Sequence, residues 1–383
     1  MKSPLIIFAL CIGLLQISCK QPEPDVVNGF TIPSTTLNEN DAANLTVNLN
    51  GTINAPISVS YEVREGTAKF DTDVKSQSGE LSFDPDNTTA QLAIELIDDS
   101  HFELSESFEV VLSYDGRSWN TAILLSDDDQ IGPAQRDGEG YITPESYPSM
   151  ELIWQDEFDG TSLNTTDWTF EYGNGCDKGL CGWGNNELQL YTDEEANIKL
   201  ENGRMTITAR EDNGTYTSTR IITQDKVEVR FGRIDIRAKM PKGQGIWPAL
   251  WMLGANIDDV SWPMCGEIDI MELVGHEPAT THGTVHYDDS GYKYNGNSKT
   301  LSTGDLSDEF HVYSIVWDRD VIHWYLDNEW FKTFEKRNIG TYPFNDAFFF
   351  IMNIAVGGNW PGSPDNTTVF PQEMVVDYVR VFQ

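Results

Sequence analysis

Hydrophobic and polar residues alternate in short stretches along much of this chain. Between residues 26 and 130, the stretches LTVNL, ISVSYEV, AQLAIEL and TAILLS are separated by clusters of turn-forming residues. A period of two is typical of strands with one buried face and one exposed face. The pattern therefore predicts an antiparallel β-sandwich over residues 26–130.

The later part of the chain, residues 149–383, also contains many predicted strands, such as RMTITAR, FHVYSIVWD and FFFIMNIAV. No long stretch has the period of an amphipathic helix. Residues 131–148 contain three Pro and three Gly and predict a linker. We therefore expect an all-β protein, in which a smaller antiparallel sandwich precedes a large β-sandwich of two sheets.

The N-terminal residues predict a signal peptide. Residues 4–17 form an apolar run that is short for a membrane span and is followed by Ser18 and Cys19. A small residue before Cys resembles a bacterial lipoprotein signal. That resemblance implies a signal over residues 1–19, lipidation of Cys19 and a polar tether over residues 20–25. The expected location is the bacterial cell envelope, with the outer membrane preferred, and the lipid would be the only membrane contact. Simple secretion is the alternative.

The charge of the chain excludes some partners. Asp and Glu number 61 against 25 Lys and Arg, a formal net charge of −36, which argues against nucleic acid. In residues 26–130 the acids cluster at predicted strand ends, as in Asp127–Asp129. Such clusters suit Ca²⁺ but also a solvated acidic rim. The pattern IELIDDSHFELSESFEVVLS, closed by LSDDD, resembles the Calx-beta domain, a calcium-binding sandwich.

Two cysteines in the later part are candidates for a disulfide. Cys176 and Cys181 flank a turn that contains Gly, and they could pair in an oxidising compartment. A metal site is less favoured because no second pair of Cys or His accompanies them. Cys265 is expected to be a buried thiol.

Three acids interrupt an apolar stretch in the segment GEIDIME. These are Glu267, Asp269 and Glu272. Buried strand faces avoid unpaired acids, so a local conflict of this kind indicates function. With a period of two, Glu267 and Asp269 share a face, whereas Glu272 points to the opposite one. A β-bulge at Ile270–Met271 adds the one residue that brings all three acids to one face.

Acids gathered in this way suit the hydrolysis of glycosides. Two carboxyls about 5–5.5 Å apart carry out the retaining reaction through a covalent intermediate. Glu267 would attack the anomeric carbon, and Glu272 would protonate the leaving oxygen and then act as a base toward water. Asp269 would orient the nucleophile and help to keep Glu272 protonated. Taken alone, the pattern leaves two alternatives: an exposed strand with solvated acids, and a Ca²⁺ site.

The wider sequence resembles glycoside hydrolase family 16, in its laminarinase-like branch. The matching stretches span nearly all of residues 150–383: DEFDG (156–160), GWGNNELQLYT (182–192), FGRIDIRAKMPKGQGIWPALWML (231–253), SWPMCGEIDIMELVG (261–275), GTVHY (283–287), NIAVGGNWPG (353–362) and VDYVRVFQ (376–383). The resemblance implies a jelly roll with a concave cleft. It also implies a retaining endo-hydrolase of β-1,3-glucan, with mixed-linkage glucan as an additional substrate. Its nucleophile, assisting acid and acid/base correspond to Glu267, Asp269 and Glu272.

Two other functions stay open. Relatives that cut sulfated galactans share the acid motif, and they need basic residues to hold sulfate. In this chain Arg220, Arg233 and Arg237 could hold it. Alternatively, the chain is a surface protein that binds glucan without cleaving it. The presence of both Glu267 and Glu272 argues against that alternative.

Several Trp residues are candidates for the cleft wall, because sugars bind to flat aromatic rings. Trp247 and Trp251 share strand parity and belong either to the cleft or to the core, and Trp262 is equally undecided. Trp183 and Trp360 lie in Gly-rich loops, where an exposed ring often contacts a ligand. For Trp360, packing is an equal alternative.

Three polar residues complete the predicted cleft. Asn186 and Arg220 resemble family positions that hydrogen-bond sugar hydroxyls, and their alternatives are a turn Asn and a surface cation. His286 is expected beside the acids, although a lone His on a strand is often only structural.

The family resemblance also implies a structural Ca²⁺ site away from the cleft. It would be built from Glu157, the backbone of Gly203, and Asp377, since hard oxygen ligands suit this ion. Capping and turn roles are the alternative for these residues. Catalysis itself needs no cofactor, and we expect a monomer.

Overall fold

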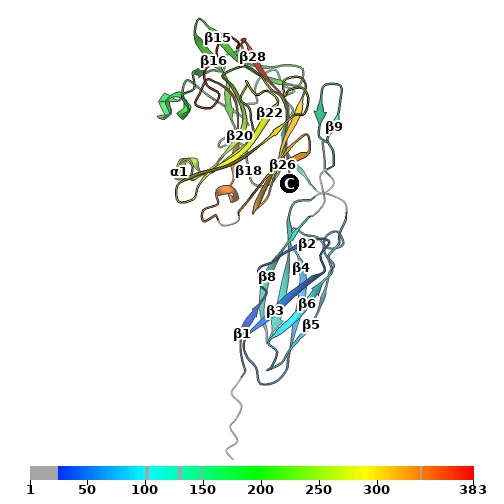
Figure 1. Cartoon of the computed structure of the whole chain (residues 1–383). Helices are drawn as coiled ribbons and strands as arrows, with labels where there is room; N and C mark the ends of the chain where they lie inside the picture. The colour runs from blue at the N-terminus through cyan, green and yellow to red at the C-terminus, as the bar shows by residue number, and fades with distance from the viewer. Residues whose placement is uncertain (1–24, 100–102, 128–131, 148–149, 337–338) are drawn as a thin grey trace, which may run out of the picture. The chain divides into compact units, whose positions relative to one another are not determined.

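The chain folds into two compact units. The computed structural model describes residues 25–99, 103–127, 132–147, 150–336 and 339–383 (Figure 1). The N-terminal unit comprises residues 1–99 and 105–128, and the C-terminal unit comprises residues 129–383 with the short segment 100–104. The predicted signal, Cys19 and the tether lie outside the described residues. Among the residues that are described, no helix is both long and apolar enough to cross a membrane.

The described part of the N-terminal unit is a β-sandwich, as predicted. One sheet has the order β1 (Val26–Thr31), β3 (Ala43–Thr52), β6 (Thr89–Ile94). The other has the order β2 (Thr36–Asn38), β8 (Arg117–Ser126), β7 (Glu106–Tyr114), β4 (Ile57–Glu65), β5 (Ser78–Phe83). Inward residues such as Val47, Val59 and Phe108 form its core. In this unit the hydrophobic positions of the alternating sequence pattern are therefore the buried ones.

The described part of the C-terminal unit contains two large sheets (Figure 1). The first sheet has the order β13 (Gln189–Tyr191), β16 (Thr215–Ser218), β15 (Met205–Asp212), β28 (Gln372–Phe382), β19 (Gly232–Lys239), β24 (His311–Trp317), β25 (Val321–Leu326), β26 (Glu329–Glu335), with β11 (Leu152–Asp156) paired to β28 and β14 (Ile198–Leu200) to β15. The second sheet has the order β12 (Thr169–Glu171), β17 (Arg220–Ile222), β27 (Phe348–Val356), β20 (Ile246–Gly254), β21 (Glu267–Glu272), β22 (Thr280–Asp288), β23 (Tyr292–Thr300), with β18 (Glu228–Val229) paired to β27. Helical segments are short: η1 (Cys176–Lys178), η2 (Cys181–Gly184), α1 (Ile257–Val260) and η3 (Pro343–Asn345).

The main core of this unit lies between the two sheets. Ile234 and Ile236 of the first sheet and Ile268 and Ile354 of the second belong to one buried cluster. Residues of alternate parity on the second sheet point the other way and line a cleft. The two-sheet sandwich predicted for residues 149–383 is confirmed, and the second sheet is the one that carries the site.

The stretch expected to be a linker belongs to the C-terminal unit and is partly ordered there. Within residues 132–147, β9 (Gln135–Arg136) and β10 (Tyr141–Ile142) form a small hairpin. The backbone N–H of Tyr141 donates to the carbonyl of Phe310 at 2.9 Å. Asp137 forms an ion pair with Arg237 at 2.8 Å. Sequence patterning missed this docking because it depends on partners far away in the chain.

Candidate active site

A β-bulge in β21 brings the three acids together. Glu267 and Asp269 lie opposite His286 and Thr284 of β22, and the register then shifts so that Glu272 lies opposite His282. The extra residue falls at Ile270–Met271, as predicted, and both of these side chains are buried in the core. The acids consequently share the cleft face of the second sheet.

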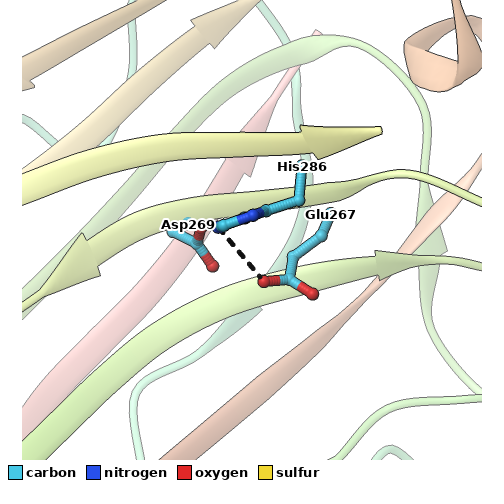
Figure 2. Close-up of side chains that lie close together, drawn as sticks. All are labelled: Glu267, Asp269 and His286. Carbon is cyan, nitrogen blue, oxygen red and sulfur yellow. Dashed lines mark ion pairs between the residues drawn. The ribbon is translucent and has the colours of Figure 1, made fainter. Parts of the chain in front are cut away.

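Glu267 is held by neighbours that favour its ionised form. The indole N–H of Trp262 donates to Glu267 Oε2 at 2.8 Å. His286 Nε2 lies 3.2 Å from Asp269 Oδ2 and 3.7 Å from Glu267 Oε1 (Figure 2). The other ring nitrogen of His286 is 2.8 Å from the hydroxyl of Tyr292. His286 thus bridges β21 and β23 next to the acids.

Glu272 lies in a more apolar part of the cleft. The indole N–H of Trp247 donates to Glu272 Oε1 at 3.1 Å. The Trp247 ring packs edge-on against Trp360, with centroids 5.7 Å apart. His282, opposite Glu272 in the sheet, also packs edge-on against Trp360, at 4.9 Å. Two Trp rings therefore lie beside the carboxyl that is expected to donate a proton.

Burial raises the pKa of all three acids. Burial first, and then the charge of Asp269, raise the pKa of Glu267 to about 8, while His286 and Trp262 lower it. Burial also raises the pKa of Asp269 to about 8. The pKa of Glu272 rises well above its usual range because of burial and then the charges of Asp269 and Glu267. Burial and the two neighbouring acids thus favour the protonated form of Glu272, which matches the acid role.

The cleft around these acids is wide and aromatic. Its volume is about 1180 Å³, and its lining includes residues from every strand of the second sheet's main order. Five Trp and two Tyr contribute to the lining: Trp183, Trp247, Trp251, Trp262, Trp360, Tyr292 and Tyr294. Such a surface offers flat apolar faces for sugar rings.

Most of the predicted cleft residues line this space. Trp247, Trp251, His286 and Trp360 belong to the lining, and Trp360 is well exposed. Trp251 donates its indole N–H to Asn353 Oδ1 at 2.8 Å. These residues are therefore available to a ligand in the cleft.

Trp183 and Arg220 form one wall of the cleft together. Trp183 also lines the cleft, but its ring is only 8% exposed. The guanidinium of Arg220 lies over the Trp183 ring at 4.4 Å and over the Trp251 ring at 4.9 Å. Arg220 and Lys178 both form ion pairs with Glu171. The cation of Arg220 is therefore neutralised where it meets the cleft.

Asn186 does not line the cleft volume, contrary to our expectation, and Asn185 does. Asn186 has φ +59°, and its amide donates to Asn359 Oδ1 at 2.7 Å. It thereby ties this loop to the loop that carries Trp360. The sequence motif does not reveal the left-handed backbone conformation of Asn186 or its bond to Asn359.

The sequence did not single out the tyrosines of β23. Tyr292 and Tyr294 are 50% and 69% exposed, and both line the cleft. Trp262, for which cleft and core were both open, is 46% exposed and donates a hydrogen bond to Glu267. The Tyr-Lys-Tyr alternation in a polar strand was the available signal, because exposed aromatic rings on one strand face often bind ligands.

The predicted disulfide is present between Cys176 and Cys181. It closes the loop that contributes Lys178 and Leu180 to the cleft wall. Cys265 is a buried free thiol, as expected.

Two of the residues expected to hold Ca²⁺, Glu157 and Asp377, form ion pairs with arginines. Both oxygens of Glu157 accept hydrogen bonds from Arg380, at 2.8 and 2.9 Å. Both oxygens of Asp377 accept from arginines, Arg237 and Arg204. Because guanidinium groups already neutralise these carboxylates, the arrangement does not fit a calcium site built on them.

Comparison with known proteins identifies the family. Residues 181–380 match the family model "Glycosyl hydrolases family 16", and residues 23–130 match "Calx-beta domain". The chain belongs to glycosyl hydrolases family 16. This membership accounts for the acid motif on a bulged strand, and it agrees with the resemblance seen in the sequence.

Two curated relatives each match more than three fifths of the chain. Glucan endo-1,3-beta-glucosidase A1 of Niallia circulans is 39% identical over 274 residues, covering 64% of this chain and 39% of that protein. Beta-glucanase of Rhodothermus marinus is 39% identical over 254 residues, covering 62% of this chain and 86% of that protein. The chain thus spans about two fifths of the first relative and most of the second.

A solved structure extends the likeness to the fold. The laminarinase catalytic domain from Thermotoga maritima MSB8 is 47% identical, with a TM-score of 0.58. The match covers 61% of this chain and 98% of that structure. The jelly-roll architecture expected for the C-terminal unit agrees with this neighbour.

Proposed function

We propose that this protein is a retaining endo-β-1,3-glucanase that hydrolyses laminarin-type glucan, and mixed-linkage β-glucan as an additional substrate. The observation that carries the proposal is the bulge in β21, which gathers Glu267, Asp269 and Glu272 on the face of an aromatic cleft. The names of the relatives support the same substrate class.

The reaction follows from the positions of the acids. Glu267 Oε attacks the anomeric carbon, and the bond to the leaving oxygen breaks as Glu272 donates its proton to that oxygen. Glu272, now ionised, removes a proton from water, whose oxygen displaces Glu267 from the anomeric carbon. Two inversions retain the β configuration. Asp269 and His286 hold Glu267 in place throughout.

The extent of the cleft supports internal cleavage. Lining residues run from Glu171 on β12 to Ser298 on β23, across the full second sheet. A chain of sugars can therefore lie on both sides of the acids. Binding several sugars on each side favours cutting within a polymer over trimming its ends.

The charges of the cleft disfavour a sulfated galactan. Among the described lining residues the Lys and Arg side chains are Lys178 and Arg220, and both pair with Glu171. Arg233 and Arg237, the other arginines that could hold sulfate, do not line the cleft and are buried in ion pairs. A neutral glucan needs no free cation, so it fits this lining better.

Product analysis tests the proposal. The purified protein is incubated separately with laminarin, mixed-linkage glucan, agarose and carrageenan, and reducing ends and the first released anomer are followed. We expect short β-1,3 oligosaccharides from laminarin, released as the β-anomer. Cleavage of a galactan alone would overturn the substrate, and binding of laminarin without cleavage would indicate a glucan-binding protein.

We further propose that a lipid on Cys19 anchors the protein to the bacterial outer membrane. The predicted signal motif supports this, and the N-terminal sandwich would then act as a spacer. Replacing Cys19 with Ser should move the protein from the membrane fraction to the soluble fraction. We also propose a monomer, which light scattering of the purified protein tests.

Calcium binding in either unit stays a prediction from the resemblances. Thermal unfolding with added Ca²⁺ and with a chelator tests it. If Ca²⁺ raises the Tm of Asp377→Asn as much as that of the wild type, the ion does not bind at the site expected around Asp377. If Ca²⁺ no longer raises the Tm of Asp377→Asn, the ion binds at the site around Asp377.

A further inference from the structure

A histidine and two of the acids converge at one point of the cleft (Figure 2). Glu267, Asp269 and His286 each offer one ligand atom, and these atoms all lie within 4.8 Å of one another. Glu267 and Asp269 belong to β21, and His286 lies on β22 directly opposite Glu267. The period of two keeps side chains at alternate positions on one face of a sheet. The paired strands therefore present two carboxylates and one imidazole together.

The spacing of these atoms is that of ligands around a small divalent cation. His286 Nε2 lies 3.2 Å from Asp269 Oδ2 and 3.7 Å from Glu267 Oε1. Two tetrahedral ligands that each lie about 2.1 Å from Zn²⁺ are about 3.4 Å from each other. The two measured distances lie on either side of this value. The three side chains can therefore supply three of the four positions of a tetrahedral zinc site.

One of the three ligand atoms is buried without a hydrogen bond. Asp269 is 2% exposed, and its Oδ2 has no hydrogen-bond partner among the described residues. His286 Nε2 lies at ion-pair distance from this oxygen, but the geometry is not that of a hydrogen bond. Buried polar atoms normally have a partner, and buried carboxylates are paired with cations or bind metals. Asp269 Oδ2 is therefore available to a cation placed between the three residues.

Outer partners hold the remaining polar atoms of Glu267 and His286. The indole N–H of Trp262 donates to Glu267 Oε2, whereas Oε1 is the oxygen that lies toward His286. His286 Nδ1 lies 2.8 Å from the hydroxyl of Tyr292. When Nδ1–H donates to that hydroxyl, the lone pair of Nε2 is free to bind a metal. Hydrogen bonds of this kind orient the ligands of zinc sites, so the set is organised before an ion arrives.

We propose that Glu267, Asp269 and His286 bind Zn²⁺ and that the bound ion inhibits the hydrolysis. An imidazole with two carboxylates suits Zn²⁺, whereas Ca²⁺ prefers a larger shell made only of oxygens. The ion would bind Glu267 Oε1 and thereby block the nucleophile. All three residues line the cleft, so the fourth position would be open to water. The inhibition rests on the hydrolytic function proposed above, and the binding does not.

Calorimetric titration with ZnCl₂ tests the binding, with the purified protein at pH 7 and without a polyhistidine tag. We expect one strong site in the wild type. Tyr292→Phe removes an outer partner and should weaken that site about 10-fold. His286→Ala removes a ligand and should weaken it by more than the roughly 10–100-fold that loss of an outer partner costs. His286→Gln should weaken it in the same way and serves if the Ala variant does not fold.

A matched control changes a histidine that has a similar hydrogen bond outside the site. His323 Nδ1 also lies 2.8 Å from a hydroxyl, that of Thr333. Among the described residues, His323 belongs to no group that could hold a metal. His323→Gln should therefore bind Zn²⁺ as tightly as the wild type. Absence of a strong site in the wild type, or equal affinity in the folded His286 variants, would overturn the proposal.

Diffraction from crystals soaked in ZnCl₂ locates the ion. Data collected at the zinc absorption edge should give an anomalous peak between Glu267, Asp269 and His286. A strong site at some other position, with no peak between these side chains, would refute the assignment of the ligands.

The rate of laminarin hydrolysis tests the inhibition. The rate should fall in proportion to the zinc occupancy that calorimetry gives, and excess EDTA should restore it. Full activity of the zinc-saturated protein would contradict the inhibition. If the wild type cleaves no glucan even in EDTA, the proposed function is wrong, and calorimetry and diffraction still decide whether the zinc site exists.

Discussion

Two strands of the C-terminal unit carry nearly the same pattern and use it differently. β19 contains Arg-Ile-Asp-Ile-Arg from Arg233, and β21 contains Glu-Ile-Asp-Ile-Met-Glu from Glu267. In both, isoleucines pack into the core between charged residues. Alternation therefore places charged groups on one face of a strand, but it does not determine what they do there.

The difference lies in the partners. On β19 the buried charges are paired, because Arg233 forms an ion pair with Asp235, which also accepts from Ser314 at 2.6 Å and from Tyr147 at 2.8 Å. On β21 the acids lie in a cleft without a basic partner of this kind among the described residues: burial raises the pKa of all three, and the charges of neighbouring acids raise the pKa values of Glu267 and Glu272 further. Neutralised charges hold a sheet together, whereas unneutralised acids at a cleft provide proton transfer and a nucleophile.

The largest expected effect is loss of catalysis on β21. Glu267→Gln keeps the shape of the side chain but cannot form the covalent intermediate. The rate of laminarin hydrolysis should fall at least about 10⁴-fold. Reducing-end assays measure the rate, and calorimetry should still detect laminarin binding. Hydrolysis near the wild-type rate would remove Glu267 from its role.

Neutralising an acid on β19 should lower the stability of the fold and leave catalysis unchanged. Asp235→Asn leaves Arg233 buried without its anion, so the free energy of unfolding should fall by about 3–5 kcal/mol. Denaturant titration measures this loss. At a temperature where the variant is folded, its pH–rate profile should match the wild type. A displaced profile would mean that β19 also tunes the acids.

A smaller effect is expected for the donor that supports the nucleophile. Trp262→Phe removes the hydrogen bond to Glu267 and keeps an aromatic ring. Because that bond lowers the pKa of Glu267, the acidic limb of kcat/KM should move up by about 0.5 unit. The control is Trp360→Phe, which changes a cleft Trp that packs against Trp247 and His282. Trp360→Phe should raise the KM for laminarin and leave the acidic limb of the kcat/KM profile nearly unchanged.

A gain in stability is expected when the nucleophile is neutralised. Glu267 binds its proton more tightly when folded, with a pKa of about 8, than an unfolded Glu at about 4.3. The folded protein therefore loses stability as the pH rises from about 4 to 8. Glu267→Gln removes this loss, so its Tm should exceed that of the wild type at pH 8 and match it near pH 4. Scanning calorimetry at both values measures the difference, and an equal gain at both would contradict the burial argument.

Much of the fold and of the acid cluster was predictable from the sequence. The period-two pattern predicts the strands, and the odd spacing of Glu267 and Glu272 predicts the bulge. The tyrosines of β23 and the pairing of Glu157 with Arg380 were not predictable. Each of these depends on which distant strand lies alongside, and side-chain pattern within one segment carries no such information.

Glu267 as the nucleophile of a retaining reaction is the central claim, and trapping the intermediate tests it most directly. The wild-type protein is incubated with a 2-deoxy-2-fluoro laminaribioside that carries a dinitrophenyl leaving group, digested, and analysed by tandem mass spectrometry. We expect one fluoro-disaccharide ester, located on the Glu267 carboxyl and absent from Glu267→Gln. An ester on Glu272 or Asp269, or turnover without any ester and with inversion of the anomer, would contradict this role of Glu267.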